Sequence, residues 1–245
     1  MEKKENSIKA KIQKNIIIII IVLIIVIIIL VDAIPDALRE MAPSIDFETV
    51  NFGGYSWLVL DERDDKMLLL SEYILFEMAY SSTRQTNTWE DSLLRKYLNN
   101  EFFNTFNQAE RELIILVVNE NPDNPRFGTN GGNDTEDLVF ILSLDEILKY
   151  FGDSGNRRSN GSLINDVYNA RRFATDINGN RVRQWWVRTP GAQNHRAVYV
   201  GQSGGSDEGV ILVNGGSRSP MSDGVTVTSN DVGVRPAMWV MIDGS

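Results

Sequence analysis

A run of sixteen consecutive apolar residues, Ile16–Val31, constrains this chain of 245 residues more than any other feature. At a rise of 1.5 Å per residue a helix over this run covers about 24 Å, and Ala33 and Ile34 extend it toward the roughly 30 Å hydrocarbon core of a bilayer. In lipid the backbone must satisfy its own hydrogen bonds, which favours a helix. The sequence therefore predicts a transmembrane helix over residues 16–34.

The flanks of this run predict its orientation. Residues 1–15 carry five of the eight lysines of the chain against two glutamates. Because basic residues accumulate on the cytoplasmic side, we expect residues 1–15 in the cytoplasm and the remainder outside, in a single-pass protein of the cell membrane. Two alternatives stay open: a cleaved signal peptide, for which Val31-Asp32-Ala33 offers a small-residue pattern, and a buried helix of a soluble protein.

The rest of the chain reads as a stalk followed by one domain. Residues 35–48 contain two prolines and scattered charges, and residues 49–245 show neither a linker nor an internal repeat. Strand material over 51–60, which contains a Gly-Gly turn, and its expected hairpin partner over 66–70 open this domain. Helices follow and short β-segments end it, which predicts an α+β fold with a C-terminal antiparallel sheet.

Three helix starts are expected in the first part of the domain. Thr88 is the expected cap of a helix whose apolar residues recur every four positions from Leu94 to Phe106. Asn107, with a glutamate three residues later, begins a second helix that is expected to carry Val118 inward. Ser143 begins a third helix, which Gly152 ends.

Composition excludes several classes of site. The chain has no cysteine and one histidine, so it has no disulfide, thiolate metal site, cysteine nucleophile or paired-histidine centre. Residues 32–155 carry a net charge of −15 and residues 156–245 one of +3. The overall negative charge and the export signal argue against nucleic acid as a partner, while the arginines of the second part suit either a solvated face or an anionic envelope polymer.

Oxygen-bearing side chains gather in the loop 121–137. Its length, two prolines and three glycines are typical of functional loops. Carboxylate and amide oxygens suit calcium, although Asn and Asp also form ordinary turns. No cofactor is otherwise expected, and the residues predicted to hold a calcium ion are Asp123, Asn124, Asn133, Asp134 and Asp137.

Aromatic and basic side chains on the last strands form a second candidate site. Adjacent strand residues point to opposite faces, which favours one of Trp185 and Trp186 in the core and the other at a loop or the surface, near Arg188; the alternative is that both pack in the core. An exposed tryptophan beside an arginine can stack on a sugar or bind an anion. His195 and Arg196 follow in a polar turn and complete the expected ligand-binding set. Arg235, in an otherwise apolar strand, is expected to meet an acidic partner or backbone carbonyls.

The order of these motifs resembles a domain of unknown function that is common in exported proteins of Gram-positive anaerobes. Val187 and Thr189 replace the usual Leu and Ser of its W-W-L-R-S-P-G motif. The resemblance extends over nearly the whole chain beyond the stalk, and its motifs stand at Phe52–Trp57, Leu94–Asn99, Asn121–Pro125, Gly131–Thr135, Tyr150–Asp153, Trp185–Gly191 and Gly233–Ala237.

The tryptophan–arginine strand and the closing strand also look like the C-type-lectin-like fold, which formylglycine-generating enzymes and phage tropism proteins share. The cysteines of those oxidases are absent here, and so are the Glu-Pro-Asn and Trp-Asn-Asp motifs of calcium-dependent lectins. The resemblance thus implies a lectin-like domain without copper-dependent oxidation or calcium-bridged sugar binding.

Together these features favour a membrane-anchored extracytoplasmic domain that binds a glycan, an envelope polymer or a surface protein. Two alternatives remain. One is a hydrolase that uses a pair of carboxylates such as Asp123 and Asp134, which requires the two groups about 5–10 Å apart in a cleft. The other is a scaffold of an envelope complex, which requires a large exposed apolar patch.

Overall fold

The computed structural model describes residues 47–85, 88–125, 127–153, 163–164, 168–180, 184–202, 209–212 and 224–242. The expected transmembrane helix over 16–34 lies outside this range. Among the described residues, no helix has the length and apolar character needed to cross a membrane. Residues 45–245 group into one compact unit, which is mixed α+β and built mainly from sheets.

The first strands pair as their turn residues predict. Gly53 and Gly54, both with positive φ, turn the chain, and a Cβ at Gly53 would lie 2.2 Å from the Phe106 ring, so only glycine fits there. A second tight turn at Asp64, with φ of 53°, returns the chain into the third strand. These strands belong to a five-stranded sheet of order β1-β2-β3-β14-β5, formed by β1 (Thr49–Phe52), β2 (Tyr55–Arg63), β3 (Lys66–Ser71), β14 (Ala237–Met241) and β5 (Ile114–Ile115).

The first expected helix begins four residues later than predicted. Ser92, not Thr88, is the N-cap of α2 (Leu93–Tyr97), because its Oγ accepts a hydrogen bond from the Arg95 N–H. The chain continues through η1 (Leu98–Phe102), a π-helical turn, and the 3₁₀ turn η2 (Phe103–Thr105). The expected apolar positions are nevertheless buried, from Leu94 to Phe106.

Both capping boxes that the sequence predicts are present. Asn107 caps α3 (Gln108–Leu113), and Ser143 caps α4 (Leu144–Phe151), which ends at Gly152 with φ of 94°. The second helix is shorter than expected, because the chain turns extended at Ile114 and forms β5 and then β6 (Val117–Asn119). The prediction that Val118 points inward is therefore wrong: its exposed fraction is 65%.

The second sheet is formed by the later strands. Its order is β4-β13-β9-β10-β11-β8, with β12 paired to β10, and β13 runs parallel to β9 while the other pairs are antiparallel. The helix α5 (Asn169–Arg172) lies among these strands in the sequence. The strands are β4 (Phe76–Glu77), β8 (Leu163–Ile164), β9 (Gln184–Pro190), β10 (Arg196–Gln202), β11 (Gly209–Leu212), β12 (Val225–Thr226) and β13 (Gly233–Val234).

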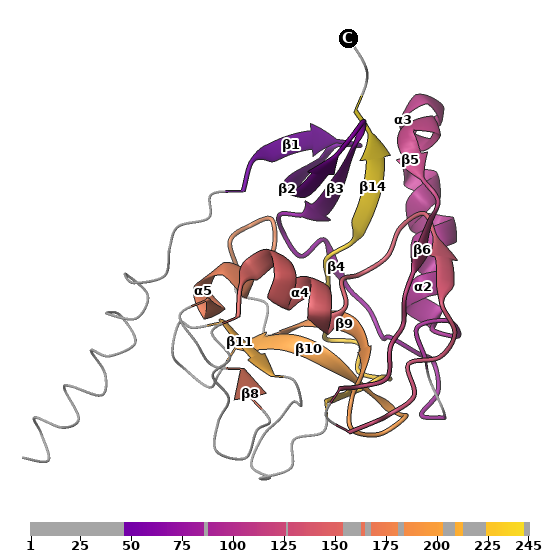
Figure 1. Cartoon of the computed structure of the whole chain (residues 1–245), viewed down its shortest axis with the longest axis vertical. Helices are drawn as coiled ribbons and strands as arrows, with labels where there is room; N and C mark the ends of the chain where they lie inside the picture. Colours follow the sequence, from indigo (N-terminus) through magenta and orange to yellow (C-terminus); the bar gives the residue numbers. More distant parts are fainter. Residues whose placement is uncertain are drawn as a thin grey trace, which may run out of the picture. The chain divides into compact units, whose positions relative to one another are not determined.

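Figure 1 shows the two sheets as separate groups, with β1, β2, β3 and β14 in one and β9, β10 and β11 in the other, and with α2 and α3 along one side. The helix α4 contacts β9 and α5. A bridge between Phe140 and Ala237 joins the 138–142 segment to β14. The remaining pair of described strands, β6 with β7 (Thr135–Asp137), forms a two-stranded ribbon.

Candidate functional site

Both tryptophans of the expected ligand-binding set belong to the core. Trp185 and Trp186 have exposed fractions of 2% and 0%, and each indole N–H donates to a backbone carbonyl, of Arg172 at 3.1 Å and of Met78 at 2.8 Å. Of the two alternatives, a tryptophan at a loop or the surface is wrong, and core packing of both is confirmed. The reason is that side chains from other segments cover both tryptophans of β9: the Tyr80 ring packs 5.5 Å from the Trp186 ring, and the Arg235 guanidinium lies 5.0 Å from the Trp185 ring. Neither indole offers a free face for a sugar.

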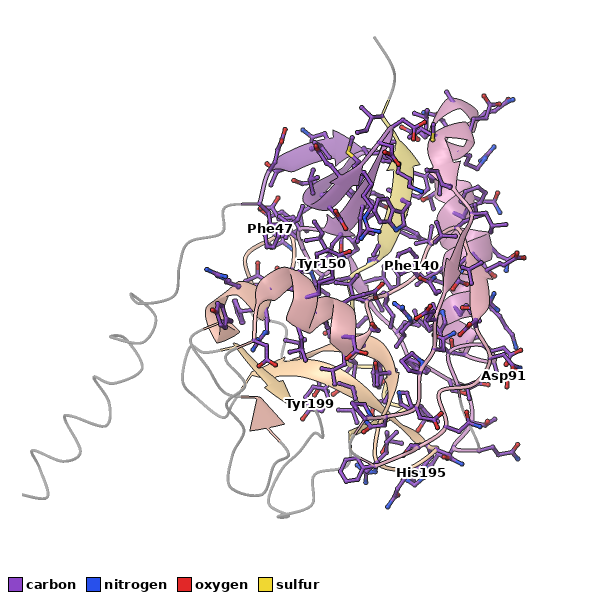
Figure 2. All side chains as sticks on the ribbon, viewed as in Figure 1. Phe47, Asp91, Phe140, Tyr150, His195 and Tyr199 are labelled. Carbon is purple, nitrogen blue, oxygen red and sulfur yellow. The ribbon has the colours of Figure 1, made fainter. Side chains whose placement is uncertain are left out.

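Arg188 is buried as well, and its guanidinium joins several segments. Its Nη1 donates to the Ile141 carbonyl at 2.9 Å and to the Glu146 carboxylate, its Nε to the Asn121 side chain at 3.2 Å, and its Nη2 to the Glu120 carbonyl at 3.3 Å. The guanidinium also lies 5.7 Å from the centre of the Phe140 ring, which Figure 2 labels. Arg188 therefore ties β9 to the loop after β6 and to the start of α4.

A pocket of about 300 Å³ lies beside this guanidinium. Carboxylates dominate its polar groups: Glu120 and Asp145 are exposed, and Glu146 is partly buried against Arg188. The pocket lies between β6, the loop that follows β6 and the first turn of α4. Its lining residues are Val118, Asn119, Glu120, Pro122, Ser143, Asp145, Glu146 and Arg188.

The pocket offers both acceptors and a donor. No hydrogen bond or ion pair among the described residues uses the carboxylate of Glu120 or Asp145. A guanidinium has five N–H bonds, and four of those of Arg188 have acceptors within the described chain, which leaves one on Nη2. Glu146, in contrast, has protein partners, because its Oε2 accepts from both Arg188 and the Ser143 backbone N–H. The site can thus accept hydrogen bonds or a positive charge from a ligand, and donate one bond in return.

Four residues of the expected calcium set hold the loop 121–137 in shape. Asp123 Oδ1 accepts from the Gly131 N–H at 3.1 Å, and Asp134 Oδ1 from the Asn121 N–H at 3.0 Å. The Asn124 side chain donates to the Pro190 carbonyl at 2.7 Å, and the Asn133 side chain donates to the carboxylate of Glu90. None of these four residues lines the pocket.

The fifth residue of that set, Asp137, is a fully buried acceptor. Its Oδ2 receives hydrogen bonds from Trp89 Nε1 at 2.9 Å, Asn119 Nδ2 at 2.9 Å and Thr135 Oγ1 at 2.7 Å, and its Oδ1 pairs with Arg95. Within the described part of the chain, no group of three or more His, Asp or Glu side chains is arranged to hold a metal ion. Calcium binding by the amide and carboxylate oxygens of the loop stays a prediction.

His195 and Arg196 do not line the pocket: His195, labelled in Figure 2, ends the turn between β9 and β10, and Arg196 is the first residue of β10. Both are half-buried. The His195 carbonyl accepts from the Val227 N–H at 3.0 Å, and Arg196 Nη1 donates to the Gly224 carbonyl at 2.7 Å, so both residues attach β12 to β10. Of the expected ligand-binding residues, only Arg188 reaches the pocket.

Arg235, which follows β13, is also buried. Its Nε and Nη2 donate to the Ser71 carbonyl at 3.0 and 2.8 Å, and Nη2 also to the Glu72 carbonyl at 3.2 Å. It lies 5.0 Å from the centre of the Trp185 ring. Arg235 was expected to meet either an acidic partner or backbone carbonyls, and the structure confirms the backbone carbonyls.

A polar cluster on the surface joins α4 to β2. Tyr150 Oη donates to Asp61 Oδ2 at 3.1 Å, and Lys149 Nζ donates to Tyr150 Oη at 2.9 Å. Desolvation raises the pKa of Asp61, but hydrogen bonds from Arg63, Tyr150 and Lys149 outweigh it, so the pKa of this carboxyl is lowered overall. This cluster holds two elements together and lines no part of the pocket.

Comparison with known proteins gives the family. The model of a domain of unknown function (DUF6273) matches residues 64–242, and the chain belongs to that family. No curated protein and no solved structure matches the chain. The C-type-lectin-like fold expected from the resemblance therefore stays a prediction.

Proposed function

We propose that this chain is a membrane-anchored, extracytoplasmic binding domain whose ligand enters the pocket beside Arg188. The observation that carries the proposal is the pocket itself, about 300 Å³ in volume, in which two carboxylates without a hydrogen-bond partner among the described residues share the lining with a guanidinium held by four hydrogen bonds. Binding sites typically combine a hollow with a few fixed polar groups, and this pocket has that composition.

The charges of the pocket favour a ligand that brings hydrogen-bond donors or a positive charge. Glu146 is neutralised by Arg188, which leaves the two charges of Glu120 and Asp145. The hydroxyl groups of a glycan can donate to these carboxylates and accept from the free N–H of Arg188. Amino groups of an envelope polymer or a protein can pair with the carboxylates directly. The basic segment 1–15 and the apolar run Ile16–Val31 support the anchor and the extracytoplasmic location.

The test uses the full-length chain in detergent micelles, applied to a glycan array, to isolated cell-wall material and to an array of seven-residue peptides. We expect binding to at least one of these probes, and we expect the double variant Glu120→Gln, Asp145→Asn to weaken it about tenfold. A matched control, Glu62→Gln with Asp65→Asn, removes two exposed carboxylates of the β2–β3 hairpin and leaves binding unchanged. Equal binding by the wild type and the pocket variant, or binding of none of the probes, overturns the proposal.

A further inference from the structure

One edge of β6 has unused backbone groups. The ladder between β6 and β7 consists of Val117↔Asp137, Val118↔Glu136 and Asn119↔Thr135. Hydrogen-bonded and non-hydrogen-bonded pairs alternate in an antiparallel ladder, and the pair of Val118 with Glu136 is a non-hydrogen-bonded one, since the Glu136 carbonyl accepts from Arg95 instead. The middle residue, Val118, therefore directs its N–H and C=O away from β7.

The opposite edge of the ribbon is covered. Arg95 Nη2 in α2 donates to the Glu136 carbonyl at 2.9 Å, which agrees with an outward-pointing Glu136 backbone. Asn99 Oδ1 accepts from the N–H of Leu138, just after β7, at 2.7 Å. The helix α2 thus takes the place of a neighbouring strand on the β7 side. Among the described strands, β6 has no neighbour on its other side.

Along this edge, exposed and buried side chains alternate, as they do in a strand with one face in solvent. Leu116, Val118 and Glu120 are exposed, the first two by 54% and 65%, whereas Asn119 between them is buried. Proteins usually protect such an edge with proline, lysine or a covering loop, because a bare apolar edge pairs with other chains. The edge residues from 116 to 120 include neither proline nor lysine.

The open edge runs directly into the acidic pocket. Val118, Asn119 and Glu120 line the pocket, and Asp145 lies on its other side. A peptide that pairs with β6 would therefore place one of its side chains over Glu120 and Asp145. Two carboxylates without protein partners favour a positively charged side chain at that position.

We infer that β6 accepts an extended peptide of a partner protein as an added strand, with a lysine or arginine side chain of that peptide in the pocket. This inference rests on the proposed function and names the partner. Backbone hydrogen bonds to Val118 provide affinity, the exposed Leu116 and Val118 contact apolar side chains of the peptide, and the pocket selects the basic residue.

The test distinguishes binding through backbone hydrogen bonds to Val118 from binding through the side chains of the pocket. Val118→Pro removes the outward N–H of the open edge, and proline is tolerated there because this N–H does not contribute to the β6–β7 ladder. Val118→Thr is the matched control, because it keeps the N–H and the branched shape. The probes are two arrays of seven-residue peptides that alternate Val and Ser around a central Lys or a central Glu, bound to the full-length chain in detergent.

We expect the central-Lys peptides to bind about tenfold more tightly than the central-Glu peptides, and Val118→Pro to weaken their binding about tenfold while Val118→Thr leaves it within about twofold. A peptide with its backbone nitrogens methylated on alternate residues gives a second measurement on the unchanged protein, and we expect it not to bind. This second measurement decides the matter even if Val118→Pro does not fold.

Three kinds of result overturn the inference. If Val118→Pro and the methylated peptide bind as well as their controls, while Glu120→Gln with Asp145→Asn still weakens a ligand, then the pocket functions without strand addition and the proposed function stands. If only glycans bind, or if binding proves to be self-association of this chain, the partner is not a basic peptide. Binding of no probe at all removes the proposed function together with the inference.

Discussion

Arg188 and Arg235 are both buried guanidiniums over aromatic rings, but they are held in different ways. Arg188 pairs with the Glu146 carboxylate and also reaches the Asn121 side chain and two backbone carbonyls. Arg235 has only the carbonyl oxygens of Ser71 and Glu72, and among the described residues its Nη1 has no hydrogen-bond partner. Burial accordingly lowers the pKa of Arg235 to about 9, although the charge of Glu72 opposes this shift.

The comparison shows which arginine the fold depends on. A buried cation without a paired anion carries most of its desolvation cost, so its removal also removes a penalty. A paired cation leaves a charged partner behind when it is removed. Arg188 therefore contributes more to stability than Arg235, even though Arg235 is the more deeply buried of the two, with an exposed fraction of 1% against 5%.

The largest effect is expected for Arg188→Met. The change removes the cation that pairs with the Glu146 carboxylate and leaves the Ile141 carbonyl without its donor, and it should lower the free energy of unfolding by about 2–3 kcal/mol. Urea unfolding of the full-length chain in detergent, followed by tryptophan fluorescence, measures the loss. A loss below that of Arg235→Met would reverse the ranking of the two sites.

Arg235→Met should cost less, about 1 kcal/mol, because the lost bonds to two carbonyls are offset by the removal of an unpaired buried charge and by an apolar side chain of similar length. The same urea titration measures the change. A loss above about 3 kcal/mol would show that the carbonyls of Ser71 and Glu72 hold the guanidinium more strongly than a carboxylate holds Arg188.

The smallest effect is expected for Asp61→Asn, which tests an ion-pair cluster that water reaches. We expect a loss of about 0.5 kcal/mol at pH 7, since Arg63 and Lys149 are half exposed and screened. The folded pKa of Asp61 is lowered, so its stabilisation is present above its unfolded pKa of about 3.9 and is lost as the pH falls through the lower folded value. Unfolding free energies of the wild type and the variant should converge near pH 2; a difference that persists there contradicts this account.

Local signals in the sequence predict the elements that depend on a few adjacent residues. The glycine turn at Gly53-Gly54 and the two capping boxes at Asn107 and Ser143 are where the sequence places them, because a turn or a cap involves only residues within one helical turn of each other. Thr88 fails as a cap for a related reason: Ser92 offers the same chemistry four residues on, nearer the first residue of α2.

The candidate site could not be predicted in the same way, because it depends on packing between distant segments. Glu120, Glu146 and Arg188 meet only after β9 has become the central strand of a sheet. Trp185 and Trp186 are both covered because Tyr80 and Arg235, from distant segments, pack against them, whereas strand alternation alone places one outside. The apolar spacing also does not predict that Val118 is exposed. It indicates one helix over 107–118, although the chain becomes extended at Ile114. The capping box at Ser143 identifies Glu146 as a capping residue, but nothing in the sequence shows that the same carboxylate also forms an ion pair with Arg188.

The short segment from β13 to β14 belongs to both sheets. β13 lies between β4 and β9, and β14 lies between β3 and β5, so each sheet has an internal gap until residues 233–241 are in place. During synthesis the ribosome adds these residues after all the other described strands. Neither sheet can become continuous while the earlier strands emerge, and we expect the domain to fold as a unit late in synthesis rather than strand by strand.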